Sequence, residues 1–338
     1  MDLTLGEREA RYDYIRRYGG WWLALTALLV IIGWGYSANP RVTRALLSAT
    51  LRQSTPLVLG ALCGLYGERA GVINIGIEGQ MLLAAFTGFL TNVYTANLPL
   101  AVAVGVLTGA VMGLLLAFMS VTLKMDQIIG GTVINILAFG LTGYFYQTGL
   151  TTQGKLQPIA LGSLARLPLV GPVLFNNPPI TYLTLLLVAL SHYVLFYTRW
   201  GLRTRAVGEH PRAADTVGIN VYKVRYVNVV AGGALAGLAG AFLTLEAVGS
   251  FERAMTNGRG FVALAVMIFG KWTPLGSWGA ALLFGLATAL QSQFQFFGVN
   301  IPHQFIGLLP YVLTIVVLAG VVGRARPPAA DGVPYEKE

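Results

Sequence analysis

Apolar segments long enough to cross a membrane recur along nearly the whole chain, and this pattern constrains the fold more than any other feature. Of the 338 residues, 55% are hydrophobic and 11% charged, whereas soluble domains carry about 25% charged residues. Lipid must therefore solvate most of this protein. Only helices or a closed barrel satisfy the backbone in lipid. Because the apolar segments are continuous and not alternating, we expect an all-α, polytopic transmembrane helical bundle.

The candidate spans fall into a strong and a weak group. The strong candidates are long enough at 1.5 Å per residue, and they lie at roughly 21–37, 98–123, 126–149, 179–198, 224–247, 275–297 and 303–322. Weaker candidates lie near 47–66, which contains Arg52, near 72–96, which contains Glu78, and near 260–271, which is short. Together they predict about ten spans in a single transmembrane domain over residues 1–338.

Positive charge predicts the orientation of the bundle, because Lys and Arg favour cytoplasmic loops. With the amino terminus inside, the basic stretch 199–212 and the residues from Arg324 onward fall on the cytoplasmic side, and the loop 150–178 falls outside. We therefore expect both termini to be cytoplasmic, with cytoplasmic segments at 1–20, 200–222 and 324–338. The run 21–36 is expected to be a retained first helix and not a removed signal peptide. Three arginines disagree, since they would lie at the outer face: Arg41, Arg44 and Arg52.

Several classes of function are excluded by the sequence. The net charge of +9 comes from basic residues at segment ends, so it indicates membrane topology and not nucleic-acid binding. The single cysteine, Cys63, excludes a disulfide framework and a Cys-rich metal site. The three histidines, His192, His210 and His303, have no metal-ligand spacing. We expect no catalytic residue, no metal and no cofactor.

The stretch 149–156 imitates a phosphate-binding loop, but Leu156 replaces the Ser or Thr that would hold Mg²⁺. If the protein uses ATP, another subunit must therefore hydrolyse it.

Glycine spacing and interrupted spans carry information about packing. Gly105, Gly109 and Gly113 recur at four-residue spacing, which lets helix backbones approach closely. The third and eighth spans, near 72–96 and 260–271, are both short or interrupted by polar residues, and they occupy matching positions in two halves of five spans. Interrupted spans in matching positions often mark a transport pathway. The sequence therefore suggests a repeat of two halves.

The cytoplasmic stretch between the sixth and seventh spans predicts a short surface helix. Pro211 can open a helix, Glu209 suits the positive dipole just ahead of it, and Gly218 can end it. The small apolar residues Ala213, Ala214 and Val217 are spaced to dock in a partner's groove. An ordinary polar connector is the alternative interpretation.

Five segments, in order, carry a resemblance to a known family: Gly67–Gln80, Asp126–Asn135, Gly208–Ala214, Asn257–Ala265 and Ile301–Tyr311. They resemble the permease subunits of ATP-binding-cassette (ABC) importers in the branched-chain amino acid, ribose and nucleoside superfamily. The sequence Asn-Ile-Gly-Ile-Glu-Gly at 74–79 favours the nucleoside branch. The resemblance covers roughly residues 50–320, and it does not extend to the first 45 residues or to the tail after Arg324.

The resemblance implies the partners and the location. Such importers pair two related permeases with an ATPase, which in the nucleoside branch is usually a tandem fusion, and an extracellular lipoprotein delivers the solute. It implies a multi-pass protein of a bacterial-type cell (inner) membrane, in contact with lipid. It also implies that 208–219 is the coupling helix that sits in a cleft of the ATPase. The coupling residues are then Gly208, Glu209, Pro211, Ala213, Ala214, Val217 and Gly218.

A pathway for an uncharged, hydroxyl-rich solute should offer amide side chains and aromatic faces within an apolar bundle. The candidates are Asn74, Glu78, Gln80, Gln127, Asn135, Gln291, Phe294 and Gln295. Glu78 stands out, because an acid inside a bilayer costs about 2.5–3.5 kcal/mol on insertion scales. It either faces a cavity or partner, or it is a structural acid satisfied by backbone amides at a break near Gly79. Buried amides likewise also bond helices together.

Three other functions stay open at this point. The chain could be an ABC permease for a simple sugar or amino acid. It could also be a secondary transporter driven by a proton or sodium gradient, with Glu78 and Glu246 as candidate ion sites. A membrane-embedded enzyme is a further alternative, although no nucleophile–base pair or metal ligand set supports it.

Overall fold

The structure is a computed structural model that describes residues 26, 30, 32–296 and 326–337, with the side chains of 294–296 outside this description. Helices account for nearly all of its regular elements. In chain order these are α2 (Pro40–Arg69), α3 (Ile77–Thr95), α4 (Leu98–Ala117), α5 (Gln127–Phe145), β1 (Ile159–Ala160), α6 (Val170–Leu174), β2 (Asn176–Asn177), α7 (Pro179–Tyr197), α8 (Arg199–Glu209), α9 (Pro211–Thr216), α10 (Val221–Ala241), α11 (Arg259–Phe269) and α12 (Pro274–Phe296).

Four of the long helices begin at a polar residue that caps the first turn. The side chain of each cap accepts a hydrogen bond from a backbone amide two or three residues ahead, which satisfies a donor that the helix itself cannot. A proline at the first or second position of α2 and α4 supports the same start. The caps are Asn39, Asn97, Asp126 and Asn220.

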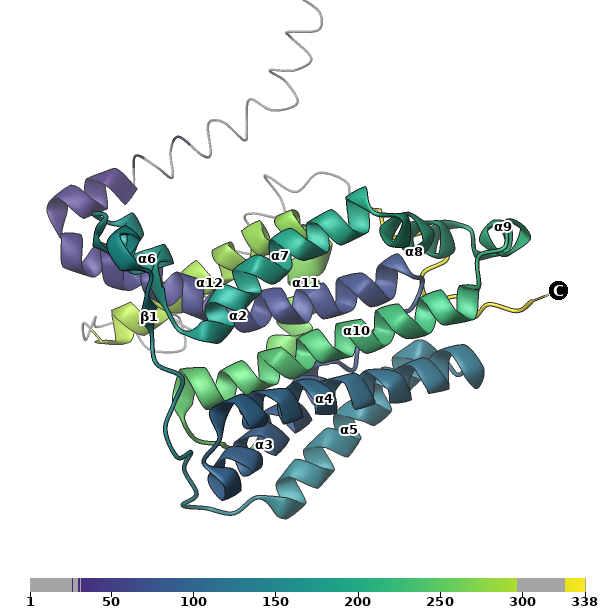
Figure 1. Cartoon of the computed structure of the whole chain (residues 1–338), viewed down its shortest axis with the longest axis horizontal. Helices are drawn as coiled ribbons and strands as arrows, with labels where there is room; N and C mark the ends of the chain where they lie inside the picture. The colour runs from purple at the N-terminus through teal and green to yellow at the C-terminus, as the bar shows by residue number, and fades with distance from the viewer. Residues whose placement is uncertain (1–25, 27–29, 31, 297–325, 338) are drawn as a thin grey trace, which may run out of the picture.

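The long helices run side by side in one bundle with two distinct ends (Figure 1). One end carries α6 and the loop around it, and we call it the α6 end. The opposite end carries α8, α9 and the chain's C-terminal tail, and we call it the α9 end. The two short strands form one antiparallel pair, Ile159 with Asn177 and Ala160 with Asn176, at the α6 end.

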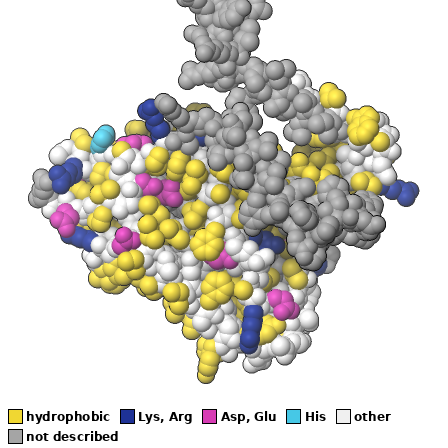
Figure 2. All heavy atoms as spheres, turned by 180° about the vertical axis from the view of Figure 1, so that it is seen from behind, with side chains coloured by type: hydrophobic (Ala, Val, Ile, Leu, Met, Phe, Trp, Pro, Cys, Tyr) yellow, Lys and Arg dark blue, Asp and Glu magenta, His cyan; other side chains and the backbone are white. Residues whose placement is uncertain are grey.

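The outside of the bundle is apolar. Hydrophobic side chains occupy much of the face in Figure 2. Leu107 of α4, Ile136 of α5 and Leu186 of α7 are each more than 60% exposed, at 63%, 67% and 63%. Exposed leucines and isoleucines on several neighbouring helices are expected where lipid is the solvent.

Within the described residues, four helical segments are long and apolar enough to cross a membrane: Leu98–Thr122, Gln127–Phe145, Pro179–Tyr197 and Val221–Val248. They confirm four of the strong predicted spans. The predicted span near 275–297 corresponds to α12, and those near 21–37 and 303–322 lie largely or wholly outside the described residues. The total of ten spans and the orientation stay predictions.

Glycines let α4 and α10 pack with their backbones in contact. A Cβ atom on Gly109 would lie 2.3 Å from the carbonyl oxygen of Gly233, and one on Gly113 would lie 2.7 Å from that of Val229. Real Cβ atoms do not approach so closely, so only glycine fits at these positions. The close packing predicted from the four-residue spacing is confirmed.

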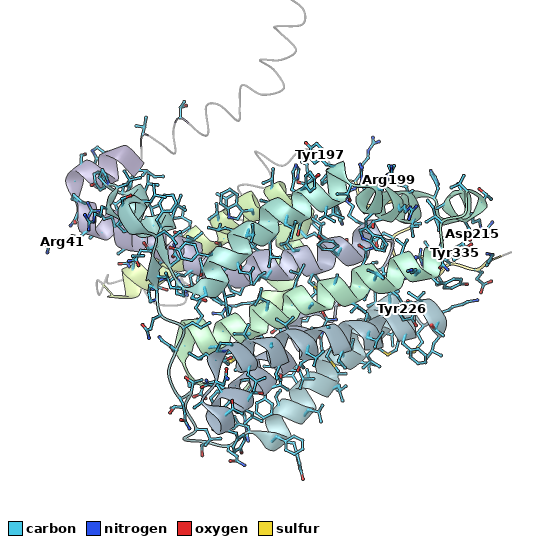
Figure 3. All side chains as sticks on the ribbon, in the orientation of Figure 1. Arg41, Tyr197, Arg199, Asp215, Tyr226 and Tyr335 are labelled. Carbon is cyan, nitrogen blue, oxygen red and sulfur yellow. The ribbon has the colours of Figure 1, made fainter. Side chains whose placement is uncertain are left out.

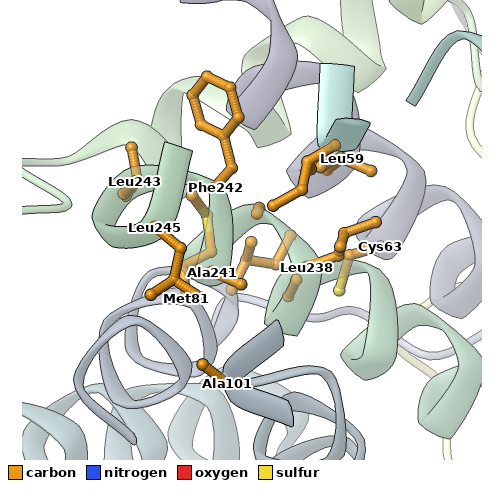
Figure 4. Close-up of a cluster of buried hydrophobic side chains, with 13 residues drawn as sticks. Leu59, Cys63, Met81, Ala101, Leu238, Ala241, Phe242, Leu243 and Leu245 are labelled. Carbon is orange, nitrogen blue, oxygen red and sulfur yellow. The ribbon is translucent and has the colours of Figure 1, made fainter. Parts of the chain in front are cut away.

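Figure 4 shows a cluster of buried hydrophobic side chains contributed by several of the long helices. Leu59 and Cys63 of α2, Met81 of α3 and Ala101 of α4 meet Leu238 of α10 there. The cluster continues into the π-helical segment Phe242–Val248 that follows α10. The long helices are therefore fixed to one another near the middle of the bundle.

The three weak span candidates differ from one another. The first, 47–66, lies within the 30-residue helix α2. In the second, residues 72–76 are not helical, and α3 begins only at Ile77. The third is α11, whose 11 residues extend about 16 Å, roughly half of the 30 Å hydrocarbon core. The second candidate is thus interrupted and the third is short, as the sequence predicted. As a helix, α11 is too short to span.

Candidate functional site

A cavity of about 570 Å³ lies toward the α6 end. Its walls come from α2 around Pro56, from residues 155–158, from the π-helical segment after α10, and from residues 252–259 that lead into α11. Proline has no amide hydrogen, so Pro56 cannot bond the carbonyl of Arg52 one turn earlier. Arg52 and Gln53 both line the cavity at this point.

The charges of the cavity wall are mixed. Arg52, Lys155 and Arg259 bring positive charge, and Glu246 and Glu252 bring negative charge. Glu246 is 6% exposed. Its carboxylate accepts hydrogen bonds from the amides of Ile180 and Thr181 and from the Thr181 hydroxyl, at 2.8, 3.2 and 2.6 Å.

Glu246 thus caps the start of α7, because the first amides of a helix have no partner within it. Beside the charged residues, the wall also carries the neutral side-chain amides of Gln53 and Gln157. Amides beside apolar walls suit a neutral solute with hydroxyl groups.

Four of the predicted pathway residues instead bond at the break between α2 and α3. Asn74 Nδ2 donates to Gln80 Oε1 at 3.1 Å and to Cys63 Sγ at 3.3 Å. Gln127 Oε1, from the start of α5, accepts from the Ile73 amide at 2.6 Å. The side chains of Asn74, Gln80 and Gln127 are all buried.

Asn135 of α5 closes the other side of the break. Its Oδ1 accepts from the Gly79 amide at 2.7 Å, and its Nδ2 donates to the Ile75 carbonyl at 3.1 Å. These amides replace the backbone bonds that residues 72–76 lack outside a helix. They therefore hold the break together and bond helices to one another, which is the second of the two roles open to them from sequence.

Glu78 bonds the start of the short helix α11. Its Oε1 accepts from the Gly258 amide at 2.8 Å, and its Oε2 accepts from the Gly260 amide at 2.6 Å. The side chain is 1% exposed. A carboxylate at this point stabilises the positive end of α11.

The neighbour of Glu78, Ile77, packs beside Gly60, nine residues before the end of α2, which is about 14 Å along that helix. The acid therefore lies well inside the bundle. It is satisfied by backbone amides, although these belong to α11 and not to the break near Gly79.

The remaining pathway candidates lie on α12. Gln291 is partly buried, and the side chains of Phe294 and Gln295 lie outside the described residues. The cavity wall includes none of the predicted pathway residues whose side chains the structure describes. Their direct role in solute passage therefore stays a prediction.

The segment 208–219 forms the short helix that the sequence predicts. Pro211 is its first residue, α9 ends at Thr216, and Gly218 adopts the left-handed conformation with φ of 83°. The amide of Ile219 bonds the Ala214 carbonyl at 3.0 Å, as in a Schellman termination.

The apolar residues of this segment do not form one face. Ala213 and Val217 are exposed, Val217 to 75%, whereas Ala214 is only 4% exposed. Ala214 packs against Val207 and Val221 of its own chain. Docking on a partner can therefore use Ala213 and Val217 but not Ala214.

A match to a family of known proteins identifies the family of this chain. The family described as "Branched-chain amino acid transport system / permease component" matches residues 46–318. This chain belongs to that family of transport permeases.

Curated relatives match this permease over most of its length. It is 39% identical over 315 residues to the guanosine ABC transporter permease protein NupQ of Bacillus subtilis (strain 168), which covers 88% of this chain and 98% of NupQ. It is 40% identical over 298 residues to the nucleoside ABC transporter permease protein NupC of Lactococcus lactis subsp. cremoris (strain MG1363), covering 84% and 94%.

A third relative is the putative glucose ABC transporter permease protein TsgC13 of Haloferax volcanii, 37% identical over 304 residues, covering 83% and 92%. No solved structure matches the permease. The permease is a non-catalytic membrane subunit of an ABC transporter.

Two sets of residues in this permease escaped the sequence analysis. The first is the cavity wall around Gln53. The charged residue Arg52 inside an apolar run was the sequence feature that could have indicated it. The second is the C-terminal tail 326–337, which lies at the α9 end and contacts α8, α9 and α10. The tail falls outside the matched residues 46–318, and its short polar sequence carries no pattern that predicts docking.

Proposed function

We propose that this permease imports nucleosides, together with a separate ATPase that hydrolyses ATP, a second permease and an extracellular binding lipoprotein. The observation that carries the proposal is the pair of relatives named for guanosine and for nucleosides, which are 39% and 40% identical over more than 80% of this chain.

A second permease in the complex is supported by a further relative. The guanosine ABC transporter permease protein NupP of Bacillus subtilis (strain 168) is 30% identical to this chain over 249 residues. NupP and NupQ are thus two permeases named for the same solute in one organism. We therefore propose that this chain pairs with a related but different permease.

The cavity toward the α6 end is the proposed solute compartment. Its 570 Å³ lie within the range of about 300–1,000 Å³ typical of small-molecule sites. The amides of Gln53 and Gln157 can bond ribose hydroxyls or base edges, and the apolar side chains of Phe242 and Met255 border the same space.

The α9 end is the proposed cytoplasmic side of a bacterial-type cell membrane. The basic residues Arg199, Arg203 and Arg205 lie on α8 at this end, where positive charge favours the cytoplasm. The exposed side of α9 would then face the ATPase.

Uptake by the reconstituted transporter tests this proposal. Proteoliposomes containing both permeases, the ATPase and the lipoprotein should accumulate radiolabelled guanosine only when ATP is supplied on the α9 side. Gln53→Ala should reduce uptake at low guanosine concentration, whereas Gln147→Ala, at an exposed position outside the cavity wall, should leave it unchanged. Uptake that survives an inactive ATPase but stops with a protonophore would refute the proposal.

Glucose is the second candidate solute, because one relative at 37% identity is named for it. The same vesicles distinguish the two. Guanosine uptake that excess glucose does not inhibit supports a nucleoside permease, and accumulation of glucose without guanosine would replace nucleosides by a sugar.

A further inference from the structure

The C-terminal tail, residues 326–337, crosses the α9 end as an extended segment with turns at 329–332. The amide of Ala330 donates to the Gly208 carbonyl at 2.9 Å, and the amide of Ala329 donates to Glu209 Oε2 at 3.1 Å. These bonds fix the tail to the end of α8. Glu209 therefore meets the tail, in addition to lying just ahead of α9.

The far part of the tail packs on α9 and α10. Tyr335 is 6% exposed and belongs to the buried cluster that contains Ala214 of α9 and Val221 of α10. Its ring centroid lies 5.5 Å from that of Tyr222. The ammonium of Lys337 lies 3.5 Å from the carboxylate of Asp215 on α9. Figure 3 shows Tyr335 and Asp215 together at this end of the bundle.

The middle of the tail reaches the break between α2 and α3. A Cβ atom on Gly71 would lie 3.0 Å from the Ala330 carbonyl oxygen, and one on Gly332 would lie 2.8 Å from Ile73. Arg225 of α10, only 1% exposed, donates to the Val333 carbonyl at 2.9 Å. The tail is thus in direct contact with both α9 and the break.

The helix α9 needs contacts with other segments, such as the tail, to be stable. An isolated helix of six residues is unstable in water, and Ala214 is its buried residue. The tail supplies Tyr335 to the cluster around Ala214. It also supplies the Val333 carbonyl that accepts from the buried Arg225 at 2.9 Å, and a buried charge without a partner is strongly destabilising.

The contacts continue from the break into the bundle. Ile73, which touches the tail, donates its amide to Gln127, and Asn74 beside it bonds Gln80. Two residues before Gln80 lies Glu78, which holds the start of α11. A chain of contacts therefore runs from the tail beside α9, through the break, to the start of α11.

We propose that the tail 326–337 is a strap that positions α9 against the break between α2 and α3, so that movement of α9 is passed to the interior of the bundle. The residues that act are positioning residues: Tyr335 at α9, and Ala330 with Gly332 at the break. The strap stays attached through the transport cycle. This inference rests on the proposed coupling of α9 to an ATPase.

Solute transported per ATP hydrolysed by the reconstituted transporter tests the strap. Tyr335→Ala should let the complex assemble and hydrolyse ATP but lower this ratio about fivefold or more, the range of a typical coupling free energy. Tyr335→Phe keeps the ring and should restore the ratio. Val333→Ala is the matched control in the same segment, because its side chain is 53% exposed and its bonded carbonyl is retained. An unchanged ratio in Tyr335→Ala would overturn the proposal.

A cross-link tests the strap even if the transporter carrying Tyr335→Ala does not assemble. The double variant Asp215→Cys and Lys337→Cys, joined by a short thiol-reactive cross-linker, fixes the tail to α9. The only natural cysteine, Cys63, is 1% exposed and should not react. A strap that remains attached predicts an unchanged ratio after cross-linking, whereas a tail that must detach predicts a block, which would overturn the proposal. Failure of the proposed function differs from both, because it appears in the wild-type transporter as absent guanosine uptake.

Discussion

Replacing Glu78 by alanine should destabilise the permease by removing the link between α3 and α11. The carboxylate accepts from the amides of Gly258 and Gly260 at 2.8 and 2.6 Å, in a site where Glu78 is 1% exposed. Each buried amide left without a partner costs about 1–3 kcal/mol. We therefore expect Glu78→Ala to lower the free energy of unfolding by about 2–6 kcal/mol, and Glu78→Gln, which keeps one acceptor oxygen, by about 1–3 kcal/mol.

The natural cysteine provides the assay. Cys63 is the single cysteine of the chain and is 1% exposed, so a thiol-reactive dye reports unfolding during heating of the complex with cysteine-free partner subunits. Gln147→Ala is the control, because that side chain is exposed and outside the cavity wall, and surface changes are usually within about 0.5 kcal/mol. If Glu78→Ala unfolds at the wild-type temperature while transport is lost, Glu78 acts on the solute and the structural interpretation is refuted.

Three further predictions concern packing, the α9 surface and the tail. Gly109→Val should force α4 and α10 apart and reduce the amount of folded permease in membranes, because its Cβ would lie 2.3 Å from the Gly233 carbonyl oxygen, whereas Gly140→Val, with nothing within 4 Å, should have no effect. Ala214→Arg should lower the unfolding temperature, since residue 214 is buried, whereas Ala213→Arg should leave it unchanged and weaken co-purification of the ATPase. Burial raises the pKa of Asp331 from 3.8 to about 6, with Glu68 of α2 and Arg225 of α10 facing it. Because the folded pKa exceeds the unfolded one, tail docking should weaken as pH rises from about 4 to about 6. The anisotropy of a dye on Val333→Cys, in a Cys63→Ala background, should fall over that range, and no fall, or the same fall in Asp331→Asn, would contradict this assignment.

Hydropathy and capping patterns predicted much of the fold, because they act locally. The spans at 98–123, 126–149, 179–198 and 224–247 each match an apolar helix, and Pro211 and Gly218 frame α9 as the sequence predicted. The predicted start of the span near 72–96 was less accurate, because α3 begins only at Ile77. Residues 72–76 are apolar enough to continue a helix, but hydrogen bonds from the side-chain amides of Gln127 and Asn135 on α5 hold them in a non-helical conformation.

The candidate site was harder to predict, because a polar side chain in an apolar bundle can hydrogen-bond other protein groups instead of lining the solute cavity. Asn74 and Asn135 are the amide side chains expected along a pathway for a hydroxyl-rich solute, yet they bond other protein groups at the break. Gln53 lines the cavity because distant segments meet there, which no local pattern encodes. The docking of the tail likewise depends on contacts more than 100 positions away in the sequence.

Cross-linking from the two ends of the bundle tests the account most directly. Val217→Cys places a thiol on the exposed side of α9, and Ser163→Cys places one on an exposed segment at the α6 end. In the assembled transporter, we expect Val217→Cys to cross-link to the ATPase, and Ser163→Cys to react only with a membrane-impermeant reagent added outside the cell. A cross-link of the ATPase to position 163, with none to position 217, would contradict the assignment of α9 as the coupling helix.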